Sequence, residues 1–205
     1  MAIITAAEAK AYIPTLSAGS TADDTLLNDL IGKFDQVAAA YMGYPQQSSG
    51  AISIESGTYV EHLDGPGGRE LYLAAKPVTA ITSIYDDPDM EYTAAADLVA
   101  ASDYTLHGLE GLVIMDHDSS EGTWSKGTRR AIQVTYVAGY SGGTMPQAVK
   151  HAACLQVAHW YGGRAHIGRS NVSMGGQSAA LMSLELLPET RQALDPYRLA
   201  TCWVG

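Results

Sequence analysis

Histidine and cysteine side chains between residues 151 and 166 are the first candidates for chemistry in this chain. His151, Cys154 and His159 fall within one predicted helix, and His166 follows it. At 100° per residue the three helical side chains point in different directions, and none of the closed zinc spacings is present. The pattern therefore predicts ordinary helix residues and no metal site.

Other chemical motifs fail in the same way. No Gly-x-Ser-x-Gly sequence occurs, so a nucleophile elbow is not predicted. The glycine-rich run 65–68 lacks the lysine and hydroxyl of a P-loop and indicates a hairpin turn. Asp86, Asp87 and Asp89 lack the glycine and distal glutamate of an EF-hand, which favours a solvated turn. We expect no catalytic residue, no metal ligand and no cofactor.

A small basic patch is the remaining candidate. Arg164 and Arg169 flank His166, and the stretch 165–180 is rich in Gly and Ser without a regular period. Such a stretch predicts a long exposed loop. Arginines beside it can bind phosphate or a partner's carboxylate. Plain surface solvation is the competing interpretation.

Composition limits the class of partner. The 205 residues include 22 Asp and Glu against 12 Lys and Arg, a net charge of −10. Tight wrapping of nucleic acid over a broad basic face is not expected, whereas an acidic wall past which DNA slides is compatible. Cys154 and Cys202 form no disulfide framework and indicate free thiols. Without a signal peptide or transmembrane run, we expect a soluble protein made in a cytoplasm.

A strand followed by a helix is the central structural unit around which we expect the other elements to pack. Residues 131–137 alternate apolar and polar character, and Pro146 can open a helix that runs to Tyr161. Gly162 and Gly163 then predict a left-handed C-terminal cap. The predicted buried side of this helix carries Val149, Ala152, Ala153, Gln156 and Trp160.

Helical patterns precede and follow a middle part with strand patterns. A capping box at Thr5 to Glu8 opens a short helix, and 21–43 contains the clearest amphipathic helix. A last helix is expected within 188–199, shortened by Pro196. The strands are predicted at 58–63, 70–74, 78–85, 104–107, 112–115 and 131–137.

These patterns predict an α+β protein, with a helical core built from N-terminal helices plus two C-terminal helices and an inserted antiparallel β lobe. The expected division has three parts. These are 1–50 for the N-terminal helical part, 51–137 for the β lobe and 138–205 for the C-terminal helical part with its exposed loop and tail.

The ordered set of motifs resembles the head-tail connector, or adaptor, family of tailed bacteriophages. The resemblance covers nearly the whole chain. Its motifs are Ile4-Thr5-x-x-Glu8-Ala9-Lys10, Asp24-x-x-Leu27-x-x-Leu30-Ile31, Leu71-x-Leu73-x-x-x-Pro77-Val78-x-x-Ile81-x-x-Ile84, Trp124, Ile132-x-Val134-x-Tyr136-x-Ala138-Gly139-Tyr140, Pro146 with the helix to Tyr161 and Arg164, and Leu187-Pro188 to Tyr197-Arg198.

The resemblance implies a non-enzymatic structural subunit of a phage virion. Its subunits would form a homo-oligomeric, dodecameric ring under the portal protein, extend the DNA channel and dock tail or tail-completion proteins. Genomic DNA would pass transiently without sequence-specific binding, no membrane would be involved, and assembly would occur in the host cytoplasm.

The resemblance also suggests partner contacts in 165–180 and 198–205. Together with the basic patch, these stretches give a predicted partner interface of Arg164, Arg169, Met174, Gln177, Arg198, Trp203 and Val204.

Two other functions stay open on the sequence alone. The β lobe is a candidate binding module for a carbohydrate or a host protein, with Tyr85, Tyr92 and Tyr104 as exposed platforms. A small hydrolase that uses His166 and Ser170 in the exposed loop is the enzyme alternative.

Overall fold

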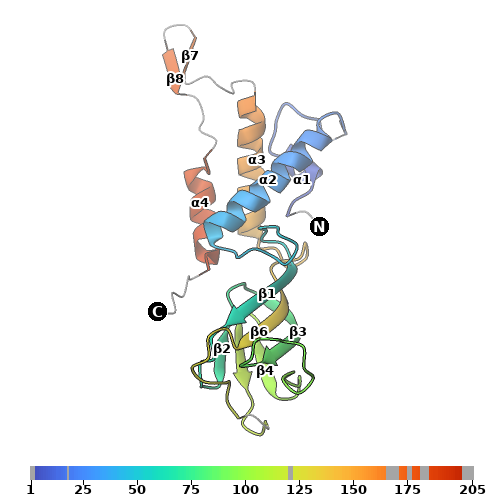
Figure 1. Cartoon of the computed structure of the whole chain (residues 1–205). Helices are drawn as coiled ribbons and strands as arrows, with labels where there is room; N and C mark the ends of the chain where they lie inside the picture. Colours follow the sequence, from blue (N-terminus) through green and yellow to red (C-terminus); the bar gives the residue numbers. More distant parts are fainter. Residues whose placement is uncertain are drawn as a thin grey trace. The chain divides into compact units, whose positions relative to one another are not determined.

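The computed structural model describes residues 3–17, 19–119, 122–164, 171–174, 177–180 and 185–199, with the backbone alone for 171–180. The chain divides into two compact units. The helical unit comprises 1–38 and 141–198, and the β unit comprises 39–140 and 199–205. The predicted α+β class, a helical core with an inserted antiparallel β lobe, is confirmed (Figure 1). The predicted boundaries at 50 and 137 stay a prediction.

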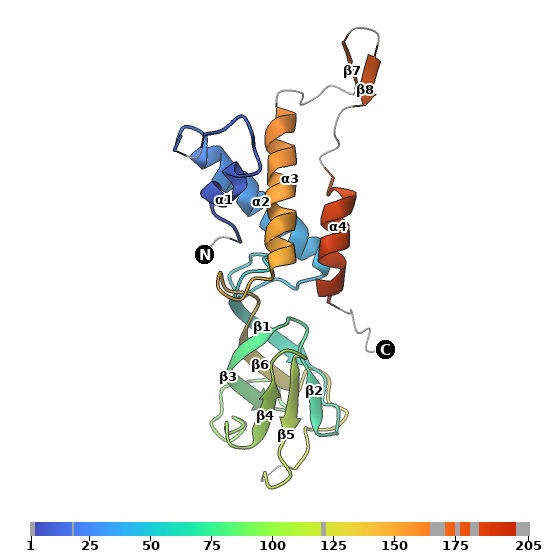
Figure 2. The ribbon, with the colours of Figure 1, turned by 180° about the vertical axis from the view of Figure 1, so that it is seen from behind.

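Among the residues that the structure describes, four α-helices and a short 3-10 helix lie wholly or mainly in the helical unit. They are α1 (Ala6–Lys10), α2 (Asp24–Met42), α3 (Gln147–Gly163), α4 (Pro188–Leu194) and η2 (Asp195–Tyr197). Helix α3 contacts both α1 and α4, and it stands between them in both ribbon views (Figures 1 and 2). Its predicted buried side is confirmed, because Val149, Ala152, Ala153, Gln156 and Trp160 are all buried.

The predicted capping box closes the start of α1. Thr5 Oγ1 accepts the backbone N–H of Glu8, and the Glu8 carboxylate accepts the backbone N–H of Thr5 at 2.6 Å. The hydrogen bonds that the carboxylate accepts from the Thr5 N–H and the Thr5 hydroxyl lower the pKa of Glu8. At the other end, the buried Lys10 ammonium donates to the Ser20 carbonyl and pairs with Asp24. Helix α1 is therefore tied to the chain that leads into α2.

The predicted glycine cap of α3 is wrong. The helix continues through Gly162 and Gly163, and Arg164 follows with right-handed backbone angles. The Arg164 guanidinium lies 3.5 Å from the centre of the Tyr161 ring and donates to the Tyr161 carbonyl at 2.6 Å. Because arginine satisfies this terminal carbonyl, no left-handed residue is needed.

Two three-stranded antiparallel sheets build the β unit. Strands β1 (Gly57–Leu63), β6 (Ile132–Ala138) and β3 (Val78–Asp86) form one sheet in the order β1-β6-β3. Strands β2 (Glu70–Tyr72), β5 (Leu112–Met115) and β4 (Tyr104–His107) form the other in the order β2-β5-β4. Their inner faces share one core, whose largest members include Trp124, Tyr59 and Tyr136.

The predicted hairpin turn at 65–68 is wrong, whereas the predicted β4–β5 hairpin is confirmed. Strand β1 pairs with β6 and β2 pairs with β5, so this run crosses from one sheet to the other. The backbone N–H groups of Gly65 and Gly67 donate to the carbonyls of Thr128 and Ser125. A Cβ atom on Gly65 would lie 2.5 Å from the Ser125 carbonyl oxygen, so glycine is required by close backbone approach.

A third correction concerns residues within the stretch 171–180. Residues 171–180, expected in a loop, include β7 (Asn171–Met174) and β8 (Gln177–Ala180), which pair antiparallel and close at Met174 and Gln177. Gly175 and Gly176 lie between the strands in the sequence, and two glycines are a typical two-residue hairpin loop. The glycine pair is therefore a sequence signal for this hairpin.

Candidate assembly interfaces

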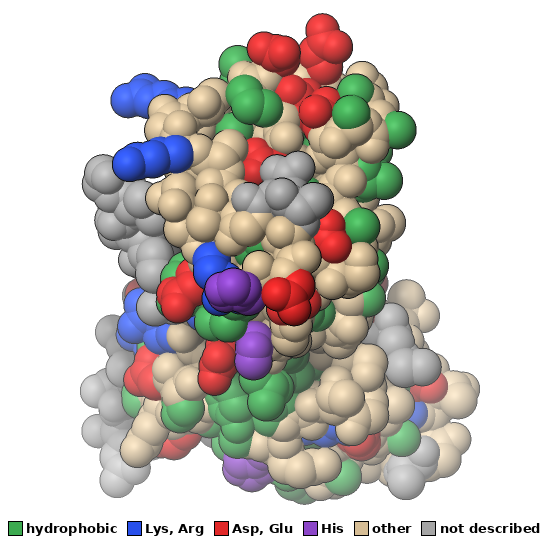
Figure 3. Space-filling model, turned by 90° about the horizontal axis from the view of Figure 1, so that it is seen from below, with side chains coloured by type: hydrophobic (Ala, Val, Ile, Leu, Met, Phe, Trp, Pro, Cys, Tyr) green, Lys and Arg blue, Asp and Glu red, His purple; other side chains and the backbone are tan. Residues whose placement is uncertain are grey.

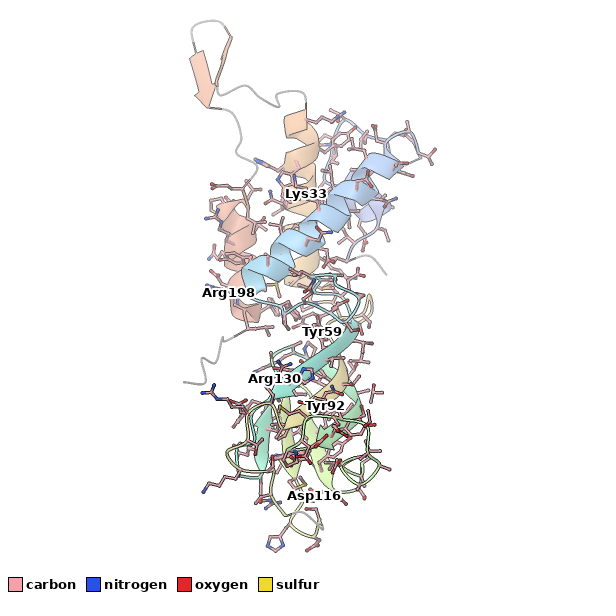
Figure 4. All side chains as sticks on the ribbon, in the orientation of Figure 1. Lys33, Tyr59, Tyr92, Asp116, Arg130 and Arg198 are labelled. Carbon is pink, nitrogen blue, oxygen red and sulfur yellow. The ribbon has the colours of Figure 1, made fainter. Side chains whose placement is uncertain are left out.

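The predicted interface residues fall at separate places along the chain. Arg164 follows α3 and is engaged with its own helix end, as described above. Met174 and Gln177 form the closing pair of the β7–β8 hairpin. Arg198 is exposed and follows η2 (Figure 4). Arg169, Trp203 and Val204 lie outside the described residues.

The β7–β8 hairpin has the properties of an element that needs a partner. Among the described residues, its two strands pair only with each other. An isolated two-stranded hairpin is marginally stable in water, and each strand leaves an edge of unpaired backbone groups. The hairpin therefore offers hydrogen-bond donors and acceptors to another chain.

A buried glutamine links the helices on either side of this hairpin. Gln156 of α3 is fully buried, its Nε2 donates to the Glu185 carbonyl at 3.2 Å, and its Oε1 accepts the Leu187 N–H at 2.8 Å. Both ends of the amide are thus used to fix the chain at the start of α4. This link between α3 and the start of α4 does not involve the hairpin.

An open pocket between α1 and α3 was not predicted. Its volume is about 210 Å³. Tyr12 Oη lies 2.9 Å from His151 Nδ1, and the two rings meet edge to face. The contact joins residues 139 positions apart, so no local sequence signal reveals it. The pocket is lined by Ile4, Glu8, Ala11, Tyr12, Gln147, Lys150, His151 and Cys154.

The chemistry of this pocket does not favour catalysis. Cys154 is buried and its thiol is free. Burial raises the pKa of Cys154 to about 11, so the nucleophilic thiolate is scarce at neutral pH. In the part of the chain that the structure describes, no three His, Cys, Asp or Glu residues are grouped to hold a metal ion.

The three tyrosines of the binding-module alternative do not form one exposed platform. Tyr104 packs against the shared core, and burial raises its pKa. Tyr85 is half-buried on β3. Tyr92 packs its ring against His62 and donates from its hydroxyl to the Arg130 carbonyl (Figure 4). His166 and Ser170, the residues of the hydrolase alternative, lie outside the described residues.

The acidic segment after β3 is a turn held by one of its own carboxylates. Asp87 is buried, contrary to the expected solvated turn, and accepts the backbone N–H groups of Asp89, Glu91 and Tyr92 at 2.7–2.8 Å. These bonds, led by that from Tyr92, lower the pKa of Asp87. Met90 and Tyr92 have positive φ, a conformation that this carboxylate stabilises locally.

The two units differ sharply in charge. The β unit contains 14 acidic and 5 basic residues, a net charge of −9. The helical unit contains 8 acidic and 7 basic residues, a net charge of −1. The acidity of the chain therefore belongs to the β unit. No helix among the described residues is long and apolar enough to cross a bilayer.

Comparison with solved structures gives neighbours of low sequence identity. The neck of an empty GTA particle, computed with C6 symmetry, contains a chain 16% identical, with a TM-score of 0.57. The match covers 97% of this chain and 91% of that chain. The virion of a native gene transfer agent particle gives 17% identity, a TM-score of 0.57 and the same coverages.

The neck of a native GTA particle, computed with C12 symmetry, gives 16% identity and a TM-score of 0.52. That match covers 97% of this chain and 90% of the other. At these identities the likeness establishes the fold. The search of curated proteins finds no match.

A family model described as "Head completion protein" matches residues 2–200. The match spans nearly the whole chain, as the predicted resemblance to head-tail connectors does, and it confirms that resemblance. It identifies a structural protein of the head-tail region of a phage-like particle. The chain belongs to the head completion protein family.

Proposed function

We propose that this chain is the subunit of a dodecameric ring that binds under the phage portal, extends the DNA channel and provides the docking surface for tail proteins. The observation that carries the proposal is the family match over residues 2–200. The helical unit forms the ring, and the β unit is carried on it. The protein has no enzymatic role and is built into the virion in the host cytoplasm.

The symmetry of the related particles supports a ring. Two of the structures with this fold are necks computed with C6 and C12 symmetry. A closed ring of identical subunits needs heterologous contacts, in which one surface of each subunit meets a different surface of the next. The chain accordingly has to carry two complementary surfaces.

The partner contacts are proposed at the β7–β8 hairpin and at the segment after η2. The unpaired strand edges of the hairpin suit the addition of a strand from a neighbouring chain. Met174 and Gln177 belong to this contact, and Arg164 and Arg169 lie before it in the chain. Arg198, Trp203 and Val204 belong to the second contact, toward the portal.

The charge of the two units supports a channel that does not retain DNA. The helical unit is almost neutral, and the β unit is strongly acidic, so neither unit offers the cation excess that holds DNA phosphates. DNA would slide through such a ring without sequence-specific contacts. Duplex DNA should therefore show no retention by the assembled protein even at low salt.

Removal of the gene from the phage genome tests the role directly. We expect DNA-filled heads that carry portals but no tails, and normal particles when the wild-type chain is supplied from a plasmid. Electron microscopy of the lysate counts tailed and tailless heads. Tailed, infectious particles in the absence of the chain would overturn the proposal.

A further inference from the structure

The outer face of the β1-β6-β3 sheet stands apart from the acidic composition of the β unit. In β6 the buried residues alternate with partly exposed ones, so Gln133, Thr135 and Val137 point away from the core. Their partners across β1 are His62, Val60 and Thr58. Neither set contains Asp, Glu, Lys or Arg. This surface, which we call the β6 face, also includes Ser83 and Tyr85 of β3.

The charged residue within β1 does not reach this face. Glu61 alternates to the inner side, where its carboxylate accepts the Tyr136 hydroxyl at 2.9 Å. His62 is the titratable side chain on the β6 face. Burial, followed by the charge of Arg130, lowers the pKa of His62 and keeps its imidazole neutral near pH 7. The strand residues of the β6 face are therefore uncharged near pH 7, and the nearest charge that acts on His62 is that of Arg130.

The outer face of the second sheet carries apolar and acidic side chains together. Tyr72, Leu112 and Ile114 point outward, because the neighbouring Leu71, Val113 and Met115 occupy the core. Thr105 and His107 of β4 lie opposite Ile114 and Leu112. Glu70 accepts the Tyr72 hydroxyl at 2.8 Å, and the Asp116 carboxylate accepts the Thr105 hydroxyl at 3.1 Å. We call this surface the β5 face. It is partly apolar, with Tyr72 55% exposed.

Among the acidic residues of the β unit that the structure describes, Glu61 lies within a strand, and the others lie in loops and at strand ends. In Figure 3 acidic side chains occur at several separate places on the surface, with hydrophobic side chains between them. A basic partner would be attracted to those acidic margins. A neutral face is instead the surface that a second, equally acidic β unit can approach without like-charge repulsion.

We infer that the β6 face of one subunit packs on the β5 face of the next subunit around the ring. The two faces belong to different sheets and lie on the two sides of the shared core, which is the arrangement that a head-to-tail contact needs. Val60 and Tyr72, which are 45% and 55% exposed, are the apolar side chains that this contact would cover. The inference rests on the proposed ring and adds a contact between neighbouring β units to the ring that the helical units form.

A charge placed on the β6 face tests the contact in the full-length chain. Thr135→Glu puts a carboxylate at the centre of the face, and Thr135→Gln has nearly the same size without the charge. Ala101→Glu adds the same charge at an exposed turn. Rings are counted by electron microscopy, alone and on the portal, over a series of protein concentrations. Thermal unfolding verifies that all three variants are folded.

We expect Thr135→Glu to raise the concentration needed for half-maximal ring formation at least ~10-fold. Thr135→Gln and Ala101→Glu should assemble like the wild type. Tyr72→Lys, added to Thr135→Glu, should restore assembly at least in part. A salt concentration of about 1 M, at which the Debye length is about 3 Å, should reduce the defect.

Cysteine cross-linking identifies the occupant of the face. In a Cys202→Ser background, Val60→Cys with Tyr72→Cys should give a ladder of disulfide-linked copies of this chain. A cross-link from the β6 face to a tail protein instead would overturn the inference. Unchanged ring formation by Thr135→Glu would overturn the surface assignment alone. Absence of rings in the wild type, with and without portal, would overturn the proposed function and this contact together.

Discussion

Glu61 is a carboxylate held inside the β unit by two hydrogen-bond donors. Its Oε2 accepts the Tyr136 hydroxyl at 2.9 Å and the Ala74 N–H at 3.1 Å. The Tyr136 hydroxyl in turn accepts the Ala75 N–H. This network ties the segment after β2 to the β1-β6-β3 sheet. Burial raises the pKa of Glu61, and the two hydrogen bonds oppose that shift without cancelling it.

Glu61→Gln should change how stability depends on pH. Because the folded-state pKa of Glu61 is raised, its favourable contribution is complete below the unfolded pKa and is lost as pH rises through the folded pKa. The free energy of unfolding of the wild type should therefore fall relative to that of the variant from about pH 4 toward pH 7. Urea unfolding of both proteins across this range measures the difference, and parallel pH curves would contradict it.

Asp87 should act in the opposite direction. Its pKa is lowered by backbone N–H donors, so its contribution is present above the unfolded pKa and is lost as pH falls through the folded pKa. Asp87→Ala should make the amides of Asp89, Glu91 and Tyr92 exchange hydrogen faster at neutral pH. Asp89→Ala keeps the Asp87 acceptor and serves as the control. Equal exchange in the two variants would show that the carboxylate does not hold the turn.

Local residue contacts were predictable and distant ones were not. The capping box of Thr5 and Glu8 follows from a spacing of three residues, and the structure contains both of its hydrogen bonds. The Glu61–Tyr136 pair joins residues 75 positions apart. A charged residue in a strand pattern does not indicate whether it has a buried partner, because the partner depends on which strands become neighbours.

At the scale of elements, α3 and α4 are linked by Gln156. Gln156→Ala leaves the Leu187 N–H and the Glu185 carbonyl without their partner, and a buried unsatisfied group costs roughly 1–3 kcal/mol. We expect the free energy of unfolding to fall by about 2 kcal/mol. Gln192→Ala, at an exposed position of α4, should change it by less than ~0.5 kcal/mol. Equal effects of the two substitutions would contradict the anchoring role.

The β7–β8 hairpin should matter for assembly more than for folding. Replacement of residues 171–180 by a Gly-Ser linker of equal length should leave the thermal unfolding midpoint nearly unchanged, because Gln156 fixes the two helices. The same variant should fail to assemble on the portal. Co-sedimentation with portal rings measures this. A variant that assembles normally would remove the hairpin from the proposed interface.

The sequence patterns located most elements and misjudged how some of them pair or end. The 4-residue strands of the β4–β5 hairpin were placed correctly because turn residues separate two apolar runs. The run 65–68 was assigned to a hairpin because glycine-rich turns and crossovers between sheets have the same composition. The Arg164 side chain caps the end of α3. From the local sequence alone, Gly162 and Gly163 would be equally compatible with a left-handed glycine cap.

At the scale of the whole molecule, charge and assembly are connected. The net charge of −10 is visible in the sequence, but its division between the two units depends on the fold that joins 1–38 with 141–198. The ordered motifs were sufficient to recognise the family. They were insufficient to locate the subunit contacts, because outer sheet faces are defined only once strand order and register are known.

The mass of the assembled protein is the most direct test of the central claim. Light scattering on the purified chain, alone and with the portal of the same genome, should show a discrete species. We predict that it contains twelve copies of the 21.7 kDa chain, in accord with the C12 symmetry of the related neck, and that it appears as rings wide enough for duplex DNA. A monomer that persists in both samples, or a ring too narrow for DNA, would contradict the account.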